Sequence, residues 1–271
     1  MAKRYYNLEK ETKAYLKACE DRGIVNQENI KKINDYVINR KVINLDTSFL
    51  SNNPVILNGL QMWVDSTVTS SYNDSPTIWN DLSPSINNGT LTNGTKSVNR
   101  LMTFDGINDS VNFSSGVVNN TYTELTVEVM FRTTTSSAQC LIENGTGFTT
   151  NSFYLFQENS TQLTFLVYGT NYNVRFCSTT YSPNTWYHLV GTWKSNEAPN
   201  VYLNGVLSNG TLQGAIQTTL RNGDANLHIG LRPISSFPFS GSIPIARIYN
   251  RALNSREVLQ NYNAQKSRFG L

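Results

Sequence analysis

Charged side chains are scarce in this chain of 271 residues, where Asp, Glu, Lys and Arg together make up 15%. Histidine occurs twice and cysteine three times, and Cys19, Cys140 and Cys177 lack the spacing of a metal site. No segment approaches the ~18 consecutive apolar residues of a membrane-spanning helix. The first residues also lack the apolar stretch of a secretory signal. We therefore expect a protein that is made in a cytosol, keeps its thiols reduced and does not insert into a membrane.

A dense cluster of basic side chains is also missing. The net charge is +3, and residues 1–45 hold 10 Lys or Arg against 6 Asp or Glu, whereas the remainder holds 12 against 13. So mild an excess is typical of a solvated helix surface and predicts no nucleic-acid partner. The chain also has no phosphate-binding loop, dinucleotide fingerprint or zinc spacing, so we expect no cofactor.

The sequence is instead rich in asparagine, with 35 residues, and in Ser and Thr. These side chains bond to nearby backbone and favour turns. Between the turns lie ten or more short segments in which apolar and polar residues alternate, as in residues 123–133. There the side chains expected to face one way are Leu125, Val127, Val129 and Phe131. This pattern predicts a mainly β protein with the architecture of a β-sandwich.

Residues 1–45 have a different pattern, because residues 7–22 and 27–41 each place apolar side chains at helical spacing. A hairpin of two such helices has only a marginal core of its own, so we expect it to pack on the rest of the chain, on another copy or in a larger assembly. We therefore interpret residues 1–45 as an anchor or oligomerisation segment, followed by a linker over residues 46–58. The contact residues expected in the segment are Leu16, Ile30, Ile33 and Val37.

Five motifs in the rest of the chain occur in a characteristic order. They are FDG at 104–106, TVEV at 126–129, WYHLV at 186–190, VYLNG at 201–205, and SGSI at 240–243 leading into IYNRAL at 248–253. In this order they resemble the concanavalin A-like jelly roll, in its laminin-G/pentraxin-like branch. The resemblance implies that residues 59–271 form one jelly-roll domain.

The same resemblance implies a short helix that closes the fold after the last strand. The local sequence favours it, because Asn254 can cap a helix and Glu257 has the spacing of a capping box. Leu253 and Val258 have the spacing of a hydrophobic staple.

A second resemblance concerns the two ends of the chain. Residues 14–39 resemble the helical segment that precedes such jelly rolls in phage structural proteins, and residues 259–271 resemble the ends of those proteins. This implies a virion component (capsid decoration, head fibre or tail-associated) whose partners are other virion proteins and further copies of itself. The jelly roll would be displayed outward, where it could touch host-surface glycan. A free carbohydrate-binding lectin is the alternative.

Some relatives of this jelly roll are glycoside hydrolases, in which two carboxylates flank the sugar bond. Glu124 and Glu128 are expected to share one face of a strand, but Thr126 stands between them where the E-x-D-x-E strand of those relatives has a carboxylate. No Ser or Cys has an evident partnership with a His and an acid. We therefore expect no catalytic residues and a protein that is not an enzyme, and we keep glycoside hydrolysis as a third hypothesis.

Two kinds of binding residue remain. Asp81, Asp105, Asn108 and Asp109 could hold a structural calcium ion, but they form no dense cluster of oxygen donors, so we favour a role in shaping turns. Exposed aromatics are the usual sugar contacts of this fold, and the candidates by residue type are Tyr168, Tyr172 and Trp193. A place in the core is at least as well supported for each of them.

Overall fold

The structure is a computed structural model. It describes residues 55–271 except 115, 119–120, 146–151, 160, 222–225 and 233–236. The predicted helical hairpin at 1–45, with its contact residues Leu16, Ile30, Ile33 and Val37, lies outside the described residues. The described part belongs to one compact unit that spans Thr47–Leu271.

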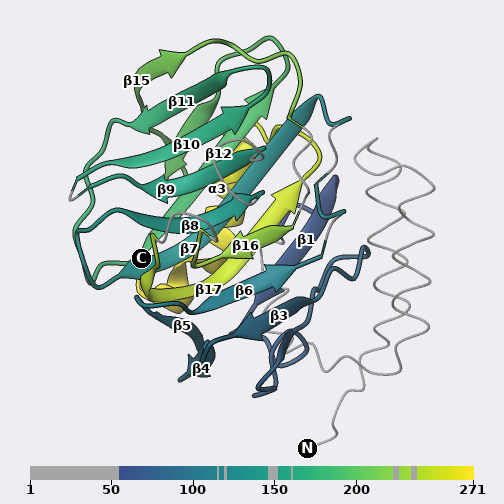
Figure 1. The fold of residues 1–271 in the computed structure, drawn as a ribbon, viewed down its shortest axis with the longest axis vertical. Helices are drawn as coiled ribbons and strands as arrows, with labels where there is room; N and C mark the ends of the chain where they lie inside the picture. Colours follow the sequence, from purple (N-terminus) through teal and green to yellow (C-terminus); the bar gives the residue numbers. More distant parts are fainter. Residues whose placement is uncertain are drawn as a thin grey trace, which may run out of the picture. The chain divides into compact units, whose positions relative to one another are not determined.

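Two antiparallel β-sheets form the unit, as the sequence predicts (Figure 1). The eight-stranded sheet has the order β14-β13-β12-β7-β17-β5-β4, and β1 also pairs with β17. Its strands are β1 (Leu60–Asp65), β4 (Lys96–Val98), β5 (Leu101–Asp105), β7 (Glu124–Thr133), β12 (Tyr187–Lys194), β13 (Asn200–Leu203), β14 (Val206–Leu207) and β17 (Ser240–Tyr249).

The nine-stranded sheet has the order β15-β11-β10-β9-β8-β16-β6-β3-β2. Its strands are β2 (Ile78–Trp79), β3 (Gly89–Thr92), β6 (Ser110–Phe113), β8 (Gln139–Asn144), β9 (Phe153–Gln157), β10 (Leu163–Tyr168), β11 (Tyr172–Cys177), β15 (Asn209–Gly214) and β16 (Leu227–Ile229). Chain neighbours such as β9 and β10 lie side by side in Figure 1, whereas β16 is inserted between β8 and β6 from far along the chain.

The hydrophobic core lies between the two sheets. The predicted inward row of β7 is confirmed, because Leu125, Val127, Val129 and Phe131 are all fully buried in this core. The facing sheet contributes the alternate side chains of β9 and β10, and Phe165 approaches Gly191 of β12 so closely that an added Cβ would lie 2.2 Å from its ring. Gly191 therefore makes room for an aromatic side chain at the centre of the sandwich.

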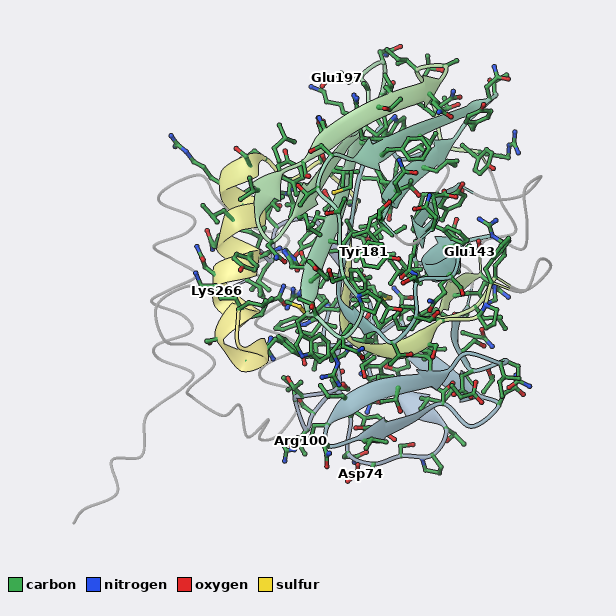
Figure 2. All side chains as sticks on the ribbon, turned by 90° about the vertical axis from the view of Figure 1, so that its left-hand side faces the viewer. Asp74, Arg100, Glu143, Tyr181, Glu197 and Lys266 are labelled. Atoms are coloured by element: carbon green, nitrogen blue, oxygen red, sulfur yellow. The ribbon has the colours of Figure 1, made fainter. Side chains whose placement is uncertain are left out.

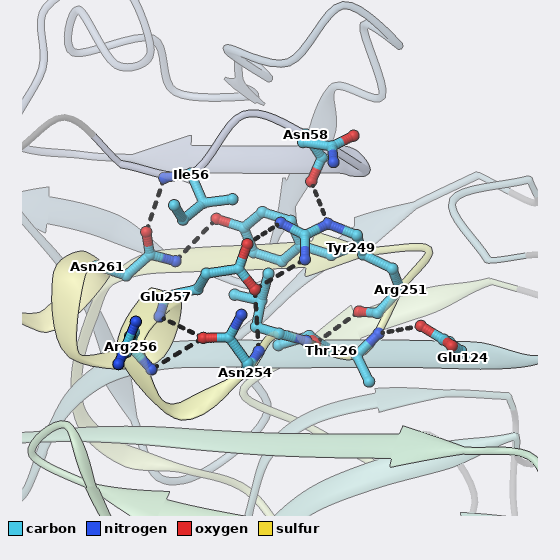
Figure 3. A network of polar contacts seen from close by, with 12 residues as sticks. Ile56, Asn58, Glu124, Thr126, Tyr249, Arg251, Asn254, Arg256, Glu257 and Asn261 are labelled. Atoms are coloured by element: carbon cyan, nitrogen blue, oxygen red, sulfur yellow. Dashed lines mark hydrogen bonds and ion pairs between the residues drawn. The ribbon is translucent and has the colours of Figure 1, made fainter. Parts of the chain in front are cut away.

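The predicted closing helix is also present, as α3 (Ser255–Gln265), followed by the short 3-10 helix η2 (Lys266–Phe269). The capping box is complete, because the Asn254 side chain accepts from the backbone N–H of Glu257 while the Glu257 side chain accepts from that of Asn254 (Figure 3). Leu253 and Val258 are buried in one hydrophobic cluster, in agreement with a staple. The helix therefore starts where the sequence predicts and packs through an apolar face.

Helix α3 packs on only one of the two outer faces of the sandwich. Its cluster contains Met130, Val190 and Tyr249, which point away from the core on β7, β12 and β17, so α3 covers the outer face of the eight-stranded sheet. Figure 2 shows Lys266, just after α3, and Glu143 of β8 on opposite sides of the molecule. The outer face of the nine-stranded sheet is thus turned away from the helix. No helix among the described residues is long and apolar enough to cross a membrane.

Candidate functional site

A row of side chains crosses the outer face of the nine-stranded sheet. Residues paired in register point to the same face, so the chain of pairings from β2 to β15 defines which side chains stand together. The row consists of Ile78, Thr90, Asn112, His228, Glu143, Tyr154, Leu166, Val174 and Gln213. It is polar over β3, β6 and β16 and apolar from β9 to β11, and Glu143 of β8 lies where the two halves meet.

The apolar half is a hydrophobic cluster separate from the core. Its buried members are Cys140, Tyr154, Phe156, Leu166, Tyr168 and Val174, with Ala138, Phe176 and Phe237 packed against them. The ring centroids of Tyr154 and Phe156 are 5.4 Å apart, and those of Tyr154 and Tyr168 are 6.4 Å apart. This cluster is separate from the core between the sheets, and its members are buried, so it can contact a ligand only where a ring is exposed at its edge.

Arg232 joins this cluster to Glu143. Its Nε lies 2.7 Å from Oε2 of Glu143, and both side chains are almost completely buried. The guanidinium also lies over the rings of Tyr154 and Phe156, at 4.7 and 5.1 Å from the centroids. Burial acts to lower the pKa of Arg232, but the Glu143 carboxylate outweighs it and raises that pKa above its usual value. The face therefore contains a buried ion pair, Arg232–Glu143, whose guanidinium packs on the rings of Tyr154 and Phe156.

Two of the three predicted sugar-contact residues meet at the edge of this cluster. Tyr168 and Tyr172 are register partners on β10 and β11, so their side chains share the outer face. Tyr172 is 47% exposed, whereas Tyr168 is mostly buried, with the Arg221 guanidinium 5.1 Å from its ring centroid. Burial, the largest effect, raises the pKa of the Tyr168 phenol. These residues form an aromatic platform that ends in one exposed ring.

The third candidate, Trp193, does not reach this surface. It pairs with Leu125 across β12 and β7, and its side chain is 1% exposed in the core between the sheets. The prediction that Trp193 contacts a sugar is therefore wrong, because the alternation of β12 turns this side chain into the core.

The polar half is a chain of hydrogen-bonding groups. Thr92 Oγ1 lies 2.6 Å from Ser110 Oγ, which donates to Asn112 Oδ1 at 3.3 Å, and Asn112 Oδ1 lies 2.7 Å from His228 Nδ1. Burial lowers the pKa of His228 to about 4, so the ring is neutral near neutral pH. No sequence motif singles out His228, Asn112, Glu143 or Arg232. Alternation along β6 and β16 could have placed Asn112 and His228 on one face of their strands. A register shift in β8 breaks the alternation before Glu143, and Arg232 lies outside the strands.

The candidate calcium ligands shape turns instead. The Asp81 carboxylate accepts hydrogen bonds from the backbone N–H groups of Trp63, Ser83 and Asn87. Asp109 accepts from the N–H of Asp105, whose own carboxylate accepts from a following N–H in the turn. Among the described residues, no group of three or more His, Cys, Asp or Glu could hold a metal ion.

The predicted carboxylate pair, Glu124 and Glu128, shares the outer face of the eight-stranded sheet, where the C-terminal segment covers it. Glu124 accepts from the backbone N–H of Ala252 at 3.0 Å (Figure 3). Glu128 is fully buried, pairs with Arg247 and accepts from Asn261 of α3 at 2.8 Å. In this structure both carboxylates therefore hold the closing segment in place.

The comparisons with known proteins agree with this architecture. The sequence model of the family described as the concanavalin A-like lectin/glucanases superfamily matches residues 105–259. No protein of curated function matches the chain. The sialidase of Trypanosoma rangeli is similar in fold, with a TM-score of 0.61 and 15% identity over 88% of this chain and 39% of that one. This chain therefore spans well under half of the sialidase.

Another solved structure is similar over almost its whole length. It is domain 4 of AbnA, a GH43 extracellular arabinanase from Geobacillus stearothermophilus, in complex with arabinotriose. The TM-score is 0.52 and the identity 17%, over 75% of this chain and 98% of that domain.

These comparisons correct one expectation from the sequence. We expected a protein that is not an enzyme, and that prediction is wrong, because the structures that the chain resembles include several sialidases and therefore point toward enzymatic members of the fold. Missing motifs were the basis of that prediction, and motifs are tied to single families whereas a fold is shared by many.

Proposed function

The chain belongs to the concanavalin A-like lectin/glucanases superfamily, and we propose that it binds carbohydrate on the outer face of its nine-stranded sheet. The observation that carries this proposal is the composition of that face. An aromatic platform that ends in the exposed ring of Tyr172 adjoins a row of polar groups that includes His228 and Asn112.

A sugar ring has an apolar C–H face and a rim of hydroxyl groups. Aromatic side chains suit the first, and fixed donors and acceptors suit the second, so a site for a sugar needs both side by side. Here Tyr168 and Tyr172 supply rings, Arg221 supplies a cation beside them, and the polar half supplies acceptors. Among the described residues, the outer face of the other sheet packs its apolar side chains against α3.

Two structures of similar fold support the same ligand class. One is a sialidase in complex with sialic acid, and another is an arabinanase domain in complex with arabinotriose. At 14% and 17% identity these likenesses concern the fold, so the ligand class is our proposal for this chain.

A glycan panel with matched variants tests the proposal. We expect binding to at least one oligosaccharide, and a loss of about tenfold in Tyr172→Ala, about 1.4 kcal/mol, because the exposed ring that would pack on the sugar is removed. Tyr172→Phe keeps the ring and should retain most of the affinity. The surface control is Leu207→Ala, at an exposed position of β14 on the other sheet. No binding by the wild type, or equal binding by Tyr172→Ala, would contradict the proposal.

The same samples answer whether the protein cleaves what it binds. Chromatography of the oligosaccharides after incubation would reveal shorter products. Such products would make the face a substrate-binding surface, and their absence with retained binding would leave a lectin-like role.

We further propose that the jelly roll is displayed on a phage particle, as a capsid decoration, head fibre or tail-associated protein, with residues 1–45 as the anchor. The support is the resemblance of residues 14–39 and 259–271 to phage structural proteins. Mass spectrometry of purified particles tests it, because an anchored protein is present in constant proportion to the major shell protein. Alanine at Leu16, Ile30, Ile33 and Val37 together should release it, whereas a free lectin would stay in the lysate in either form.

A further inference from the structure

One ring nitrogen on the proposed carbohydrate face has no hydrogen-bond partner among the described residues. Nε2 of His228 is buried and makes no hydrogen bond in the described part of the chain. The side chain as a whole is 7% exposed. Buried polar atoms are paired in the great majority of cases, and leaving one unpaired costs about 1–3 kcal/mol.

The other ring nitrogen fixes which proton the imidazole carries. Nδ1 lies 2.7 Å from Oδ1 of Asn112, which is an acceptor only, so Nδ1 must donate. A neutral imidazole has a single N–H, so Nε2 is left with a bare lone pair. The burial that lowers the pKa of His228 to about 4 keeps the ring in this neutral form.

The neighbours of His228 in the row are acceptors as well. Asn112 Oδ1 already accepts from Ser110 and His228, and on the other side stands the Glu143 carboxylate, which accepts from Arg232. A carboxylate or sulfate placed here would face these lone pairs, and the charge of Arg232 is already balanced by Glu143. A hydroxyl group can donate, so this part of the face selects for a donor rather than an anion.

We propose that Nε2 of His228 accepts a hydrogen bond from a hydroxyl group of a neutral sugar, and that His228 thereby selects the bound sugar. This inference rests on the proposed function. In the row, Glu143 stands between His228 and Tyr154, the first residue of the aromatic half. Because Nε2 is shielded in this structure, binding includes a local movement that opens a path to the ring.

The first experiment uses the wild-type protein. The chain has only two histidines, so the ring nitrogens of His188 and His228 can be followed by ¹⁵N NMR without ambiguity. The probes are the methyl glycosides of glucose, galactose, mannose and arabinose, with methyl glucuronide as the acidic comparison. At saturation with a sugar that binds, we expect the Nε2 resonance of His228 to move upfield, as an acceptor nitrogen does, while that of His188 stays. An unchanged Nε2 resonance in a saturated complex would overturn the inference.

A pair of variants provides the second test. His228→Asn keeps a donor toward Asn112 but removes Nε2, whereas His228→Gln keeps an acceptor near the Nε2 position. We expect about tenfold weaker binding of the same glycoside by His228→Asn and partial recovery by His228→Gln, with equal thermal stability as the control for folding. The mono-O-methyl sugar that lacks the donated proton should bind wild type and His228→Asn equally.

The outcomes separate this inference from the proposed function. If Tyr172→Ala abolishes binding and His228→Asn does not weaken it, the carbohydrate face stands and the role of His228 is wrong. Stronger binding of methyl glucuronide than of every neutral glycoside would also overturn the selection of a hydroxyl donor. If no glycoside binds the wild type and the glycan panel is negative, both proposals fail.

Discussion

Oε1 of Glu128 lies 3.0 Å from Nε2 of His188, and neither side chain is exposed to solvent. The two residues stand on the neighbouring strands β7 and β12, beneath helix α3. Arg247 of β17 pairs with the same carboxylate, and Asn261 and Gln265 of α3 donate to it at 2.8 and 3.2 Å. One buried carboxylate thus joins three strands to the closing helix.

Removal of this charge should destabilise the fold strongly. Glu128→Gln keeps the size of the side chain but leaves the Arg247 guanidinium buried without its counter-charge. We expect a loss of about 3–5 kcal/mol in the free energy of unfolding, as for other broken buried ion pairs, measured by urea denaturation. The control is Glu197→Gln, which breaks the exposed Lys194–Glu197 pair and should change little. Equal effects of the two variants would show that the buried cluster does not stabilise the fold.

The pKa of the Glu128 carboxylate predicts how the stability of the fold depends on pH. Burial acts to raise the pKa of Glu128, but Arg247 and His188 outweigh it and hold the pKa at about 2, below its usual 4.5. As pH falls from 4.5 to 2, the unfolded state therefore binds a proton before the folded state does. The stabilisation is complete above pH 4.5 and is lost as pH falls toward 2. Wild type should lose its stability advantage over Glu128→Gln in that window, which chemical denaturation at a series of pH values would reveal.

The lowered pKa of His228 predicts that stability also changes in a second, higher pH range. Burial lowers its pKa from 6.5 to about 4, so between these values the unfolded state holds the extra proton. Stability is complete above pH 6.5 and falls as pH is lowered to about 4. NMR titration should show the His228 ring protonating near pH 4, and His228→Gln should remove this part of the pH dependence. A ring that titrates near 6.5 would contradict the buried, neutral imidazole on which the selection of a hydroxyl depends.

Features that lie within one segment could be predicted from the sequence. The cap of α3 depends on Asn254 and Glu257, three residues apart, and its geometry needs no other part of the fold. The inward row of β7 follows from alternation along the strand, which only Met130 interrupts between Leu125 and Phe131. The order of the motifs was enough to predict the jelly roll.

The carbohydrate face could not be predicted in the same way. Glu143 and Arg232 are 89 residues apart, and Asn112 and His228 are 116 apart. Alternation shows on which face of its strand a side chain lies, but it does not show which other strand pairs with that strand. The insertion of β16 between β8 and β6 brings His228 beside both Asn112 and Glu143. Trp193 was missed for a different reason, because alternation separates the two faces of β12 but does not show which face is turned to the core.

The effects of substituting Arg232 and Glu143, the ion pair between the two halves of the face, on the free energy of unfolding should not be additive. Arg232→Met leaves the Glu143 carboxylate buried without its guanidinium, and we expect a loss of about 3 kcal/mol or more in the free energy of unfolding. Glu143→Gln alone should be similarly costly, whereas the double variant should be less destabilised than the two single changes added together, since neither charge is then left alone. Urea denaturation of the four proteins gives the coupling energy. Additive effects would mean that Arg232 and Glu143 have no net attraction. The contacts of the guanidinium with the rings of Tyr154 and Phe156 would then hold Arg232 in place.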